Sequence, residues 1–182
     1  MKLVAGLGNP GREYEDTRHN VGFRVVEAWA LRTGASWRFR GDRAEAMAGG
    51  ILLLKPLTYM NLSGPAVKEA LGFRDATASD CLVVCDDMAL TPGAIRLRPA
   101  GSSGGHHGLD SIIAALGTDA FPRLRIGIGG PPPGIPGADF VLGRFKPGES
   151  PPVEAAVDAA EAWARLGVER AMAAHNTPRQ RD

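Results

Sequence analysis

The residues best suited to chemistry lie near the start of the chain, in the segments GLGNPG and TRHNVGF. Asn9 and His19 lie on a polar connection between an apolar strand predicted over Leu3–Leu7 and an apolar helix predicted over Val21–Arg32. Loops that follow strands commonly carry catalytic groups. Because an imidazole near neutral pH can take a proton from water and return it to a leaving group, His19 is the candidate general base. A purely structural role is the alternative for any single histidine.

A general base needs a partner that fixes its tautomer, and this partner is usually a carboxylate. Asp86 and Asp87 directly follow a predicted buried strand in the segment CLVVCDD. Such a pair could orient His19, or it could simply cap a turn. His106 and His107 would add nitrogen ligands for a metal ion, but the chain lacks a ligand spacing such as H-E-x-x-H. The sequence therefore favours a base that works without a metal.

Two other kinds of site are disfavoured by the sequence. A covalent nucleophile is not indicated, because there is no G-x-S-x-G motif, and Cys81 and Cys85 fall on one face of a predicted buried strand. A nucleotide pocket is suggested only by Gly6, Gly8 and Gly11, which match G-x-G-x-x-G. The polar residues that follow them lack the helix that a dinucleotide-binding fold requires. We therefore predict direct attack by water and no cofactor.

The segment KPLTYMNLSGPAV brings a second group of polar and apolar side chains between a strand and a helix. Asn61 precedes a helix predicted over Pro65–Leu71, and it could simply cap that helix. Alternatively, its amide bonds a substrate peptide while Met60 contacts apolar parts of the same peptide.

The segment PAGSSGGHHGLDSII is a Gly-rich loop that runs into a predicted helix. Its backbone N–H groups could bind a phosphate or a carbonyl oxygen, but the Lys-Ser/Thr ending of an ATP-binding P-loop is absent. Arg96 and Arg98 share one face of a strand predicted over Ala94–Arg98, and Arg125 begins the next strand. Exposed arginines are usually solvated charges. Three of them near this loop could instead form a phosphate clamp, because a guanidinium matches phosphate oxygens.

The composition is that of an ordinary globular protein. The chain has 182 residues, of which 44% are hydrophobic and 23% charged, enough for one domain with a substantial core. The formal net charge of +1 means that any RNA-binding site must be a local patch. No apolar run approaches the length of a membrane-spanning helix, and the first residues lack the pattern of a signal peptide. We therefore expect a cytoplasmic protein without a membrane segment.

Predicted strands and helices alternate along the chain, which indicates a three-layer α/β domain. We expect one domain over residues 1–182, with residues 175–182 as a frayed tail. Continuous apolar runs predict central strands that are covered on both faces. The predicted strands are Leu3–Leu7, Ile51–Leu54, Cys81–Cys85, Ala94–Arg98 and Arg123–Gly129, and the predicted helices are Val21–Arg32, Pro65–Leu71, Ser111–Leu116 and Pro152–Ala174.

Five segments in this order, GLGNPG…TRHNVGF, TYMNLSG, DDMALTPG, GGHHGL and RLRIGIG, resemble the signature set of bacterial-type peptidyl-tRNA hydrolases. The resemblance covers the chain from about Leu3 to Gly143. Members of this family hydrolyse the ester that joins a peptide to the 3′ ribose of tRNA, and so recycle tRNA from aborted translation. The resemblance implies a monomeric α/β/α sandwich around a mixed, mostly parallel twisted sheet. It also implies that peptidyl-tRNA is bound through its acceptor stem and 3′ CCA end.

The resemblance also implies roles for individual residues. His19 would be the base that activates water, Asp86 would orient its imidazole, and Asn9 would support the developing oxyanion. Asn9 and Asn61 would bind the substrate near the scissile ester. The residues that would bind the substrate elsewhere in the site are Tyr14, Met60 and His107, and those that would contact tRNA phosphates are Arg96, Arg98 and Arg125. The segment Gly130–Ala138 would be a mobile loop near the peptide.

This chain departs from the family pattern at two positions. His107 occupies the place of the usual Asn in GGHNG, and Cys85 replaces the usual His before the aspartate. We expect activity to survive both changes. Two further classes remain as alternatives: an RNA-binding relative that has lost catalysis, and an esterase for small molecules.

Overall fold

The order of the strands determines which loops gather at the end of the sheet. This computed structural model describes residues 1–178 and, within them, a seven-stranded sheet in the order β2-β3-β4-β1-β5-β7-β6. β1 is parallel to β4 and β5, and β5 is parallel to β7, whereas β3 and β6 are antiparallel to their neighbours. The strands are β1 (Leu3–Gly6), β2 (Arg38–Arg40), β3 (Arg43–Ala48), β4 (Ile51–Pro56), β5 (Cys81–Asp87), β6 (Ile95–Arg98) and β7 (Arg123–Gly127).

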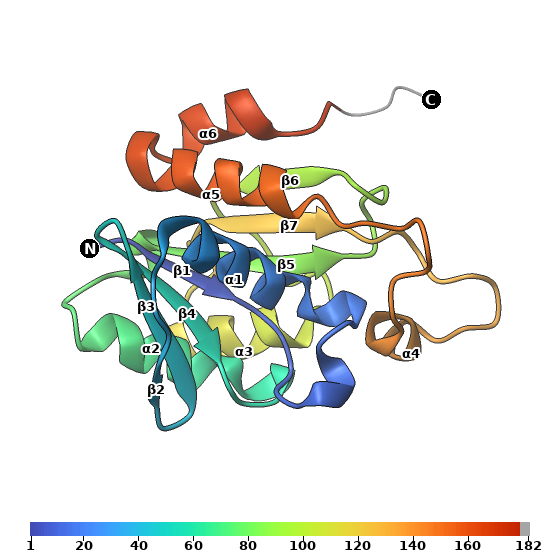
Figure 1. Cartoon of the computed structure of the whole chain (residues 1–182), viewed down its shortest axis with the longest axis horizontal. Helices are drawn as coiled ribbons and strands as arrows, with labels where there is room; N and C mark the ends of the chain where they lie inside the picture. Colours follow the sequence, from blue (N-terminus) through green and yellow to red (C-terminus); the bar gives the residue numbers. More distant parts are fainter. Residues whose placement is uncertain (179–182) are drawn as a thin grey trace.

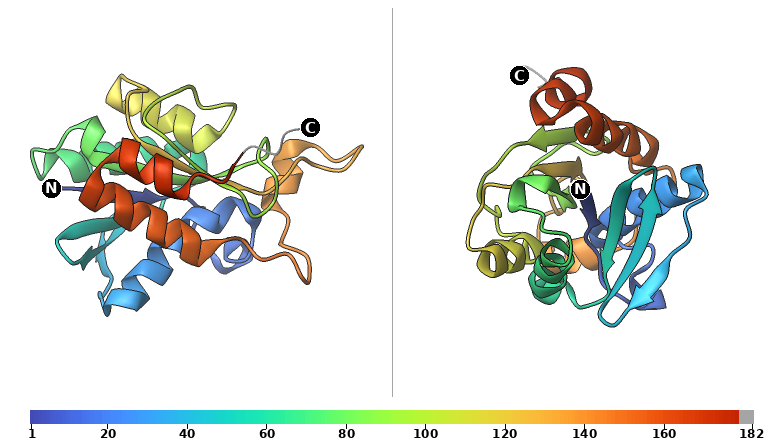
Figure 2. Two further views of the ribbon diagram at one scale, coloured as in Figure 1. Left: turned by 90° about the horizontal axis from the view of Figure 1, so that it is seen from above. Right: turned by 90° about the vertical axis from the view of Figure 1, so that its left-hand side faces the viewer.

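Helices cover both faces of this sheet. α1, α5 and α6 lie on one face, and α2 and α3 lie on the other, so the sheet is the middle of three layers (Figure 2). α4 lies beyond the ends toward which β5 and β7 point (Figure 1). The helices are α1 (Val21–Thr33), α2 (Ser63–Gly72), α3 (His107–Leu116), α4 (Gly137–Leu142), α5 (Val153–Leu166) and α6 (Val168–His175). Among the described residues, no helix has the length and apolar character needed to cross a bilayer.

β1 is apolar throughout because both of its faces are buried. Successive side chains of β1 point to opposite faces. Val4 packs with Trp29 and Trp163 beneath α1 and α5, whereas Leu3 and Ala5 pack beneath α2 and α3. β1 therefore lies between two cores, and the connection that follows it emerges at the end of the sheet.

α1 approaches the backbone of β1 and β5 closely at Gly22. A Cβ atom at Gly22 would lie 2.4 Å from the backbone nitrogen of Leu7 and 2.4 Å from the carbonyl oxygen of Val84. The next residue, Phe23, donates its backbone N–H to the carbonyl of Leu7 at 3.2 Å. The start of α1 is thus held against the ends of the two central strands. The short 3₁₀ turn Arg18–Asn20, which carries His19, lies immediately before this contact.

The predicted fold class is confirmed, and every predicted strand is present with small shifts at its ends. The helices predicted over Val21–Arg32, Pro65–Leu71 and Ser111–Leu116 are also present, the last of them beginning earlier, at His107. Three features differ from expectation: the β2–β3 hairpin, the short helix α4, which was not predicted, and the last predicted helix. The hairpin of β2 and β3 was not predicted, because its residues are rich in Ala and Arg and carry little apolar signal. The single helix predicted over Pro152–Ala174 is wrong, because Gly167, at φ 85°, separates α5 from α6.

The segment after α6 is hydrogen-bonded to the edge of the sheet, although we expected residues 175–182 to fray. The side-chain amide of Asn176 accepts from the N–H of Leu97 at 2.6 Å and donates to its carbonyl at 3.2 Å. Thr177 donates its N–H to the carbonyl of Ile95 at 3.1 Å. These bonds occupy the outer edge of β6. Residues 179–182 of the expected tail lie outside the described residues.

Replacing Gly22 by Ala tests the close approach of α1 to the sheet. The added methyl would meet backbone atoms, which cannot move aside as a side chain could, so Gly22→Ala should lower the free energy of unfolding by about 3 kcal/mol or more. Gly72→Ala is the matched control, because no atom lies within 4 Å of a Cβ there, and it should change stability by less than about 1 kcal/mol. Urea denaturation of both variants measures the difference, and equal stabilities would contradict the prediction.

Candidate active site

Seven of the ten predicted site residues gather around one cavity at the carboxyl ends of β1 and β5. The cavity has a volume of about 670 Å³. Its polar lining comes from the connection after β1, the end of β5 and the Gly-rich loop before α3, while its apolar lining includes Met60, Leu109 and residues of α4. Of the residues predicted from the sequence, those that line it are Asn9, His19, Met60, Asn61, Asp86, His107 and Arg125.

His19 and Asp86 form a buried hydrogen-bonded pair. The Nδ1 atom of His19 lies 2.7 Å from the Oδ1 atom of Asp86, and the two residues are 8% and 4% exposed. A carboxylate can only accept a hydrogen bond, so Nδ1 carries the proton in this contact. Nε2 is then the basic nitrogen of the neutral ring, as a general base requires.

His106 contacts the same carboxylate oxygen from the other side. Its Nε2 atom lies 3.0 Å from Oδ1 of Asp86. Its Nδ1 atom accepts hydrogen bonds from the backbone N–H groups of Gly108 at 3.1 Å and Leu109 at 3.4 Å, at the start of α3. Nδ1 must therefore be unprotonated, and Nε2 must carry the proton that Asp86 accepts. His106 is thus fixed as the opposite tautomer to His19.

The two histidines keep Asp86 ionised despite its burial. Burial by itself raises the pKa of this carboxyl, but the electrostatic attraction and hydrogen bond of His106, and then those of His19, outweigh burial and leave the pKa well below its ordinary value. The carboxylate is therefore negative throughout the neutral range. It can hold His19 in place and stabilise the imidazolium that forms when His19 takes a proton.

Asn9 is held so that its amide nitrogen is the group that it can offer to a substrate. The side-chain amide of Asn20 accepts from the backbone N–H of Asn9 at 2.8 Å and donates to its carbonyl at 2.9 Å. The Oδ1 atom of Asn9 accepts the backbone N–H of Met60 at 2.8 Å. Because Oδ1 is engaged in this way, the Nδ2 group of Asn9 is the donor available at the cavity.

Asn61 and His107 lie at the rim of the cavity. Asn61 is exposed on the 3₁₀ turn Met60–Leu62, and α2 begins after Leu62 without a side-chain cap among its described residues. The alternative that Asn61 caps this helix is therefore not supported. The side chain of His107 is 74% exposed, and its Nδ1 atom lies 3.8 Å from the carboxylate of Asp110.

Tyr14 and two of the predicted arginines lie outside the cavity. Tyr14 packs edge-on against Tyr59, a lining residue, with ring centroids 6.5 Å apart. Arg96 and Arg98 lie on β6 at the edge of the sheet, where they face Arg125 and Arg123 across the antiparallel pair. All four arginines lie on the face of the sheet that α2 and α3 cover, since the residues that alternate with them pack under α1 and α5. Arg125 reaches the cavity, where its Nε atom lies 2.8 Å from the carboxylate of Asp87.

Arg123 is a buried arginine that shapes the Gly-rich loop. Its guanidinium donates to the backbone carbonyls of Gly101, Ser102 and Asp119, and it lies over the ring of Phe121 at 4.4 Å. Arg123 is not among the predicted site residues, because in the sequence a strand arginine resembles any other until its burial is known. These contacts fix the Gly-rich loop, which connects β6 with His106 at the start of α3.

His19, Asp86 and His106 are also the described residues that could together hold a metal ion, since their ligand atoms lie within 4.8 Å of one another. Both ring nitrogens, however, meet a single carboxylate oxygen at hydrogen-bonding distances. A cation between them would have to displace both protons. A hydrogen-bonded cluster accounts for all of these contacts. In it, Nδ1 of His19 and Nε2 of His106 donate to Asp86, and Nδ1 of His106 accepts from the backbone of α3.

The two cysteines are core residues, as predicted. Cys81 and Cys85 are buried beneath α2 and α3. Burial raises the pKa of the Cys81 thiol to about 12 and raises that of Cys85 further. Because the thiolate is the reactive form, neither thiol is suited to act as a nucleophile.

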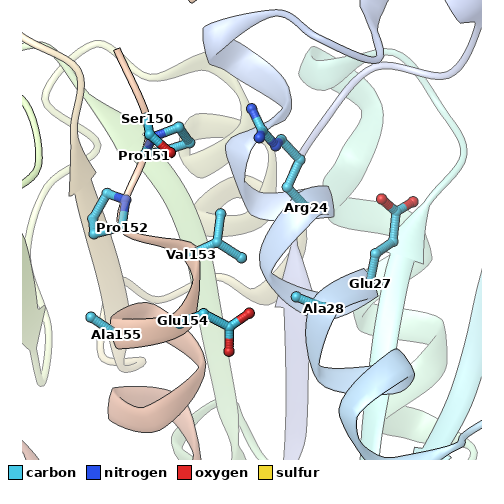
Figure 3. A pocket seen from close by; sticks show the side chains of 9 residues that line it. All are labelled: Arg24, Glu27, Ala28, Ser150, Pro151, Pro152, Val153, Glu154 and Ala155. Carbon is cyan, nitrogen blue, oxygen red and sulfur yellow. The ribbon is translucent and has the colours of Figure 1, made fainter. Parts of the chain in front are cut away.

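A second hollow lies between α1 and the start of α5 (Figure 3). Its charged side chains come from Arg24, Glu27 and Glu154. Glu27 is bound to Lys55 at 2.6 Å, and Glu154 is bound to Arg32 at 2.5 Å. Both carboxylates are occupied by surface ion pairs. We therefore assign the chemistry to the cavity that His19 lines.

The comparison with known proteins agrees with the sequence motifs. The peptidyl-tRNA hydrolase family model matches residues 3–182. The chain belongs to this family. It is 52% identical over 162 residues to the peptidyl-tRNA hydrolase of Geobacillus kaustophilus, covering 86% of this chain and 87% of the relative. It is 46% identical to the Bacillus subtilis protein of the same name, with 87% of each chain covered.

The fold agrees with solved members of the family as well. A crystal structure of peptidyl-tRNA hydrolase from Acinetobacter baumannii superposes with a TM-score of 0.85 at 34% identity, covering 97% of this chain and 95% of that one. The predicted family and the predicted enzyme class, a hydrolase, are therefore confirmed.

The opposite tautomers of His19 and His106 can be tested directly by ¹⁵N NMR of the imidazole rings. At neutral pH we expect neutral His19 to carry its proton on Nδ1 and neutral His106 to carry its proton on Nε2. The exposed ring of His107 is the internal control and should show a mixture of tautomers. The same tautomer at His19 and His106 would contradict the arrangement around Asp86.

Proposed function

We propose that this protein hydrolyses the ester bond between a peptide and the 3′ ribose of tRNA in peptidyl-tRNA, releasing free tRNA and peptide. The observation that carries this proposal is the buried His19–Asp86 pair, which leaves Nε2 of His19 as the basic nitrogen. His19 lines the same cavity as Asn9, whose Nδ2 group is available as a donor. An ester requires an activated water and a donor for the oxyanion, and these three residues can supply both. Membership of the family supports peptidyl-tRNA as the substrate.

In the proposed mechanism, Nε2 of His19 takes a proton from a water molecule, and the water oxygen attacks the ester carbonyl carbon. The carbonyl oxygen becomes the oxyanion of a tetrahedral intermediate, and Asn9 Nδ2 donates a hydrogen bond to it. The intermediate collapses as the C–O bond to the ribose breaks, and the imidazolium of His19 returns its proton to the 3′ oxygen. Asp86 stays ionised throughout and stabilises the imidazolium. The reaction uses no metal and no covalent intermediate.

The substrate would extend in two directions from this centre. Met60, Asn61 and His107 would contact the peptide, and Tyr14 would support that side through Tyr59. An imidazole at His107 can donate one hydrogen bond and accept another, as the amide of the usual Asn can, but at different positions. The tRNA phosphates of the acceptor stem would contact the arginines, which are Arg96, Arg98 and Arg125. We further propose that the protein acts in the cytoplasm as a monomer.

Removing the imidazole of His19 should abolish most turnover. General base action contributes about 10²–10⁴ in rate, so His19→Ala should lower kcat/KM for N-acetyl-aminoacyl-tRNA by roughly 10³-fold. The measurement includes a chelator and compares blocked with unblocked aminoacyl-tRNA, of which only the blocked substrate should be cleaved. His175→Ala, a histidine at the end of α6, is the control and should retain activity.

Three results would contradict the proposal in different ways. Near-normal activity of His19→Ala would exclude the mechanism. Binding of tRNA by the wild type without any cleavage would indicate an RNA-binding relative. Salt-insensitive cleavage of simple N-acyl esters would indicate an esterase for small molecules.

The role of the arginines on β6 predicts a change in salt dependence. Arg98→Gln should weaken tRNA binding and reduce the slope of log K against log salt by about 1, because one phosphate contact is lost. kcat should stay unchanged, since Arg98 lies outside the cavity. Arg40→Gln, at an exposed arginine on the opposite edge of the sheet, is the control and should leave the slope unchanged. Equal slopes for Arg98→Gln and wild type would remove Arg98 from the tRNA contact.

A further inference from the structure

α4 lines one side of the cavity. It belongs to neither of the helical layers that cover the sheet (Figure 1). It contributes Gly137, Ala138, Val141 and Leu142 to the lining. Among the described helices, strands and turns, α4 makes its main contacts with the turn Arg18–Asn20. The wall of the cavity is therefore attached to the rest of the fold through the same short turn that carries His19.

Arg18 makes most of this attachment with a single buried guanidinium. The residue is 5% exposed, and its guanidinium lies over the ring of Phe140 at 4.4 Å and 5.6 Å from the ring centre of Phe145. It donates to the carboxylate of Glu149 at 3.0 Å and to the carbonyl of Phe140 at 3.5 Å. A planar cation with several donors suits this combination of aromatic faces and oxygen acceptors, which an ammonium would match poorly.

The backbone supports the same attachment. Arg18 donates its N–H to the carbonyl of Gly143 at 3.0 Å, and Thr17 forms an antiparallel bridge with Arg144. A Cβ at Gly143 would lie 3.0 Å from Nη1 of Arg18, so the glycine leaves room for the guanidinium. The contacts from residue 140 to residue 149 thus converge on the residue that precedes His19.

We infer that Arg18 is a positioning residue that holds α4 in place as the peptide-side wall of the cavity. Through Arg18, the position of this wall is linked to the turn Arg18–Asn20, which carries His19. The inference rests on the proposed function, because it assigns the apolar side chains of α4 to the peptide of peptidyl-tRNA. Val141 and Leu142 lie on the cavity side of α4, whereas the arginines assigned to tRNA lie on β6 and β7. Arg18 therefore sets affinity for the peptide and leaves the affinity for tRNA unchanged.

The test is a comparison of Arg18→Met and Arg18→Lys with wild type on N-blocked tripeptidyl-tRNA. Arg18→Met keeps the aliphatic volume but removes the planar charge, and KM should rise about tenfold while kcat falls less than about threefold. Arg18→Lys keeps the charge, so its KM should lie between those of Arg18→Met and wild type. The inhibition constant of deacylated tRNA should stay unchanged in both variants. For N-acetyl-aminoacyl-tRNA, which carries little peptide, the rise in KM should be smaller.

Amide hydrogen exchange gives a readout that does not depend on activity. In Arg18→Met, exchange in residues 137–145 should become faster than in wild type while exchange in β1 and β5 stays the same. Glu149→Gln, a milder change that keeps the buried arginine, should show the same effect to a smaller extent. Arg32→Met removes an exposed arginine on α1 that is paired with Glu154 and Asp158, and it is the control for kinetics and exchange.

Each outcome decides the inference. A fall in kcat at constant KM, a changed inhibition constant for deacylated tRNA, or unchanged exchange over residues 137–145 would overturn it. If the wild type fails to cleave any peptidyl-tRNA, the proposed function fails. Faster exchange of α4 in Arg18→Met would then still establish the attachment, and the assignment of the wall to the peptide would be withdrawn.

Discussion

The arrangement of this protein depends on one buried carboxylate that accepts hydrogen bonds from two histidines. Asp86 lies at the end of the central parallel strand β5, and its Oδ1 atom receives Nδ1–H of His19 and Nε2–H of His106. An unpaired charge at this depth would be strongly destabilising, so the two donors are needed for the carboxylate to remain ionised. The opposite tautomers of the two rings follow from this requirement and leave one basic nitrogen for chemistry.

Several segments around the cavity are held by side chains that bond to backbone groups. Asn20 holds the backbone of Asn9, Arg123 holds the carbonyls of the Gly-rich loop, and Arg18 holds the segment that contains α4. Amide and guanidinium groups suit this task because each offers several hydrogen-bonding atoms in a fixed plane. Loops without regular hydrogen bonding thereby gain defined positions around His19, and a substrate would meet groups that are already placed.

The two departures from the family pattern fall in different environments. Neighbouring side chains of a strand point to opposite faces, so Cys85 packs in the apolar core under α2 and α3 while Asp86 reaches the cavity. A thiol at this core position asks for no polar partner. His107 is instead exposed at the rim, where it can meet a ligand directly. The change at His107 therefore alters the exposed rim of the cavity, and the change at Cys85 alters packing in the core.

The sequence by itself determined the layered α/β fold and the family, and it singled out His19, Asp86 and Asn9 as candidate site residues. Continuous apolar runs and polar residues at strand ends are local signals, and they stay visible in a linear chain. The tertiary structure decided the contacts of His106, which the sequence offered only as a metal ligand, and those of Arg18 and Arg123. Their functions depend on burial and on partners far along the chain, such as Glu149 for Arg18 and Gly101 for Arg123. Such contacts exist only after the sheet has brought separate loops to one edge.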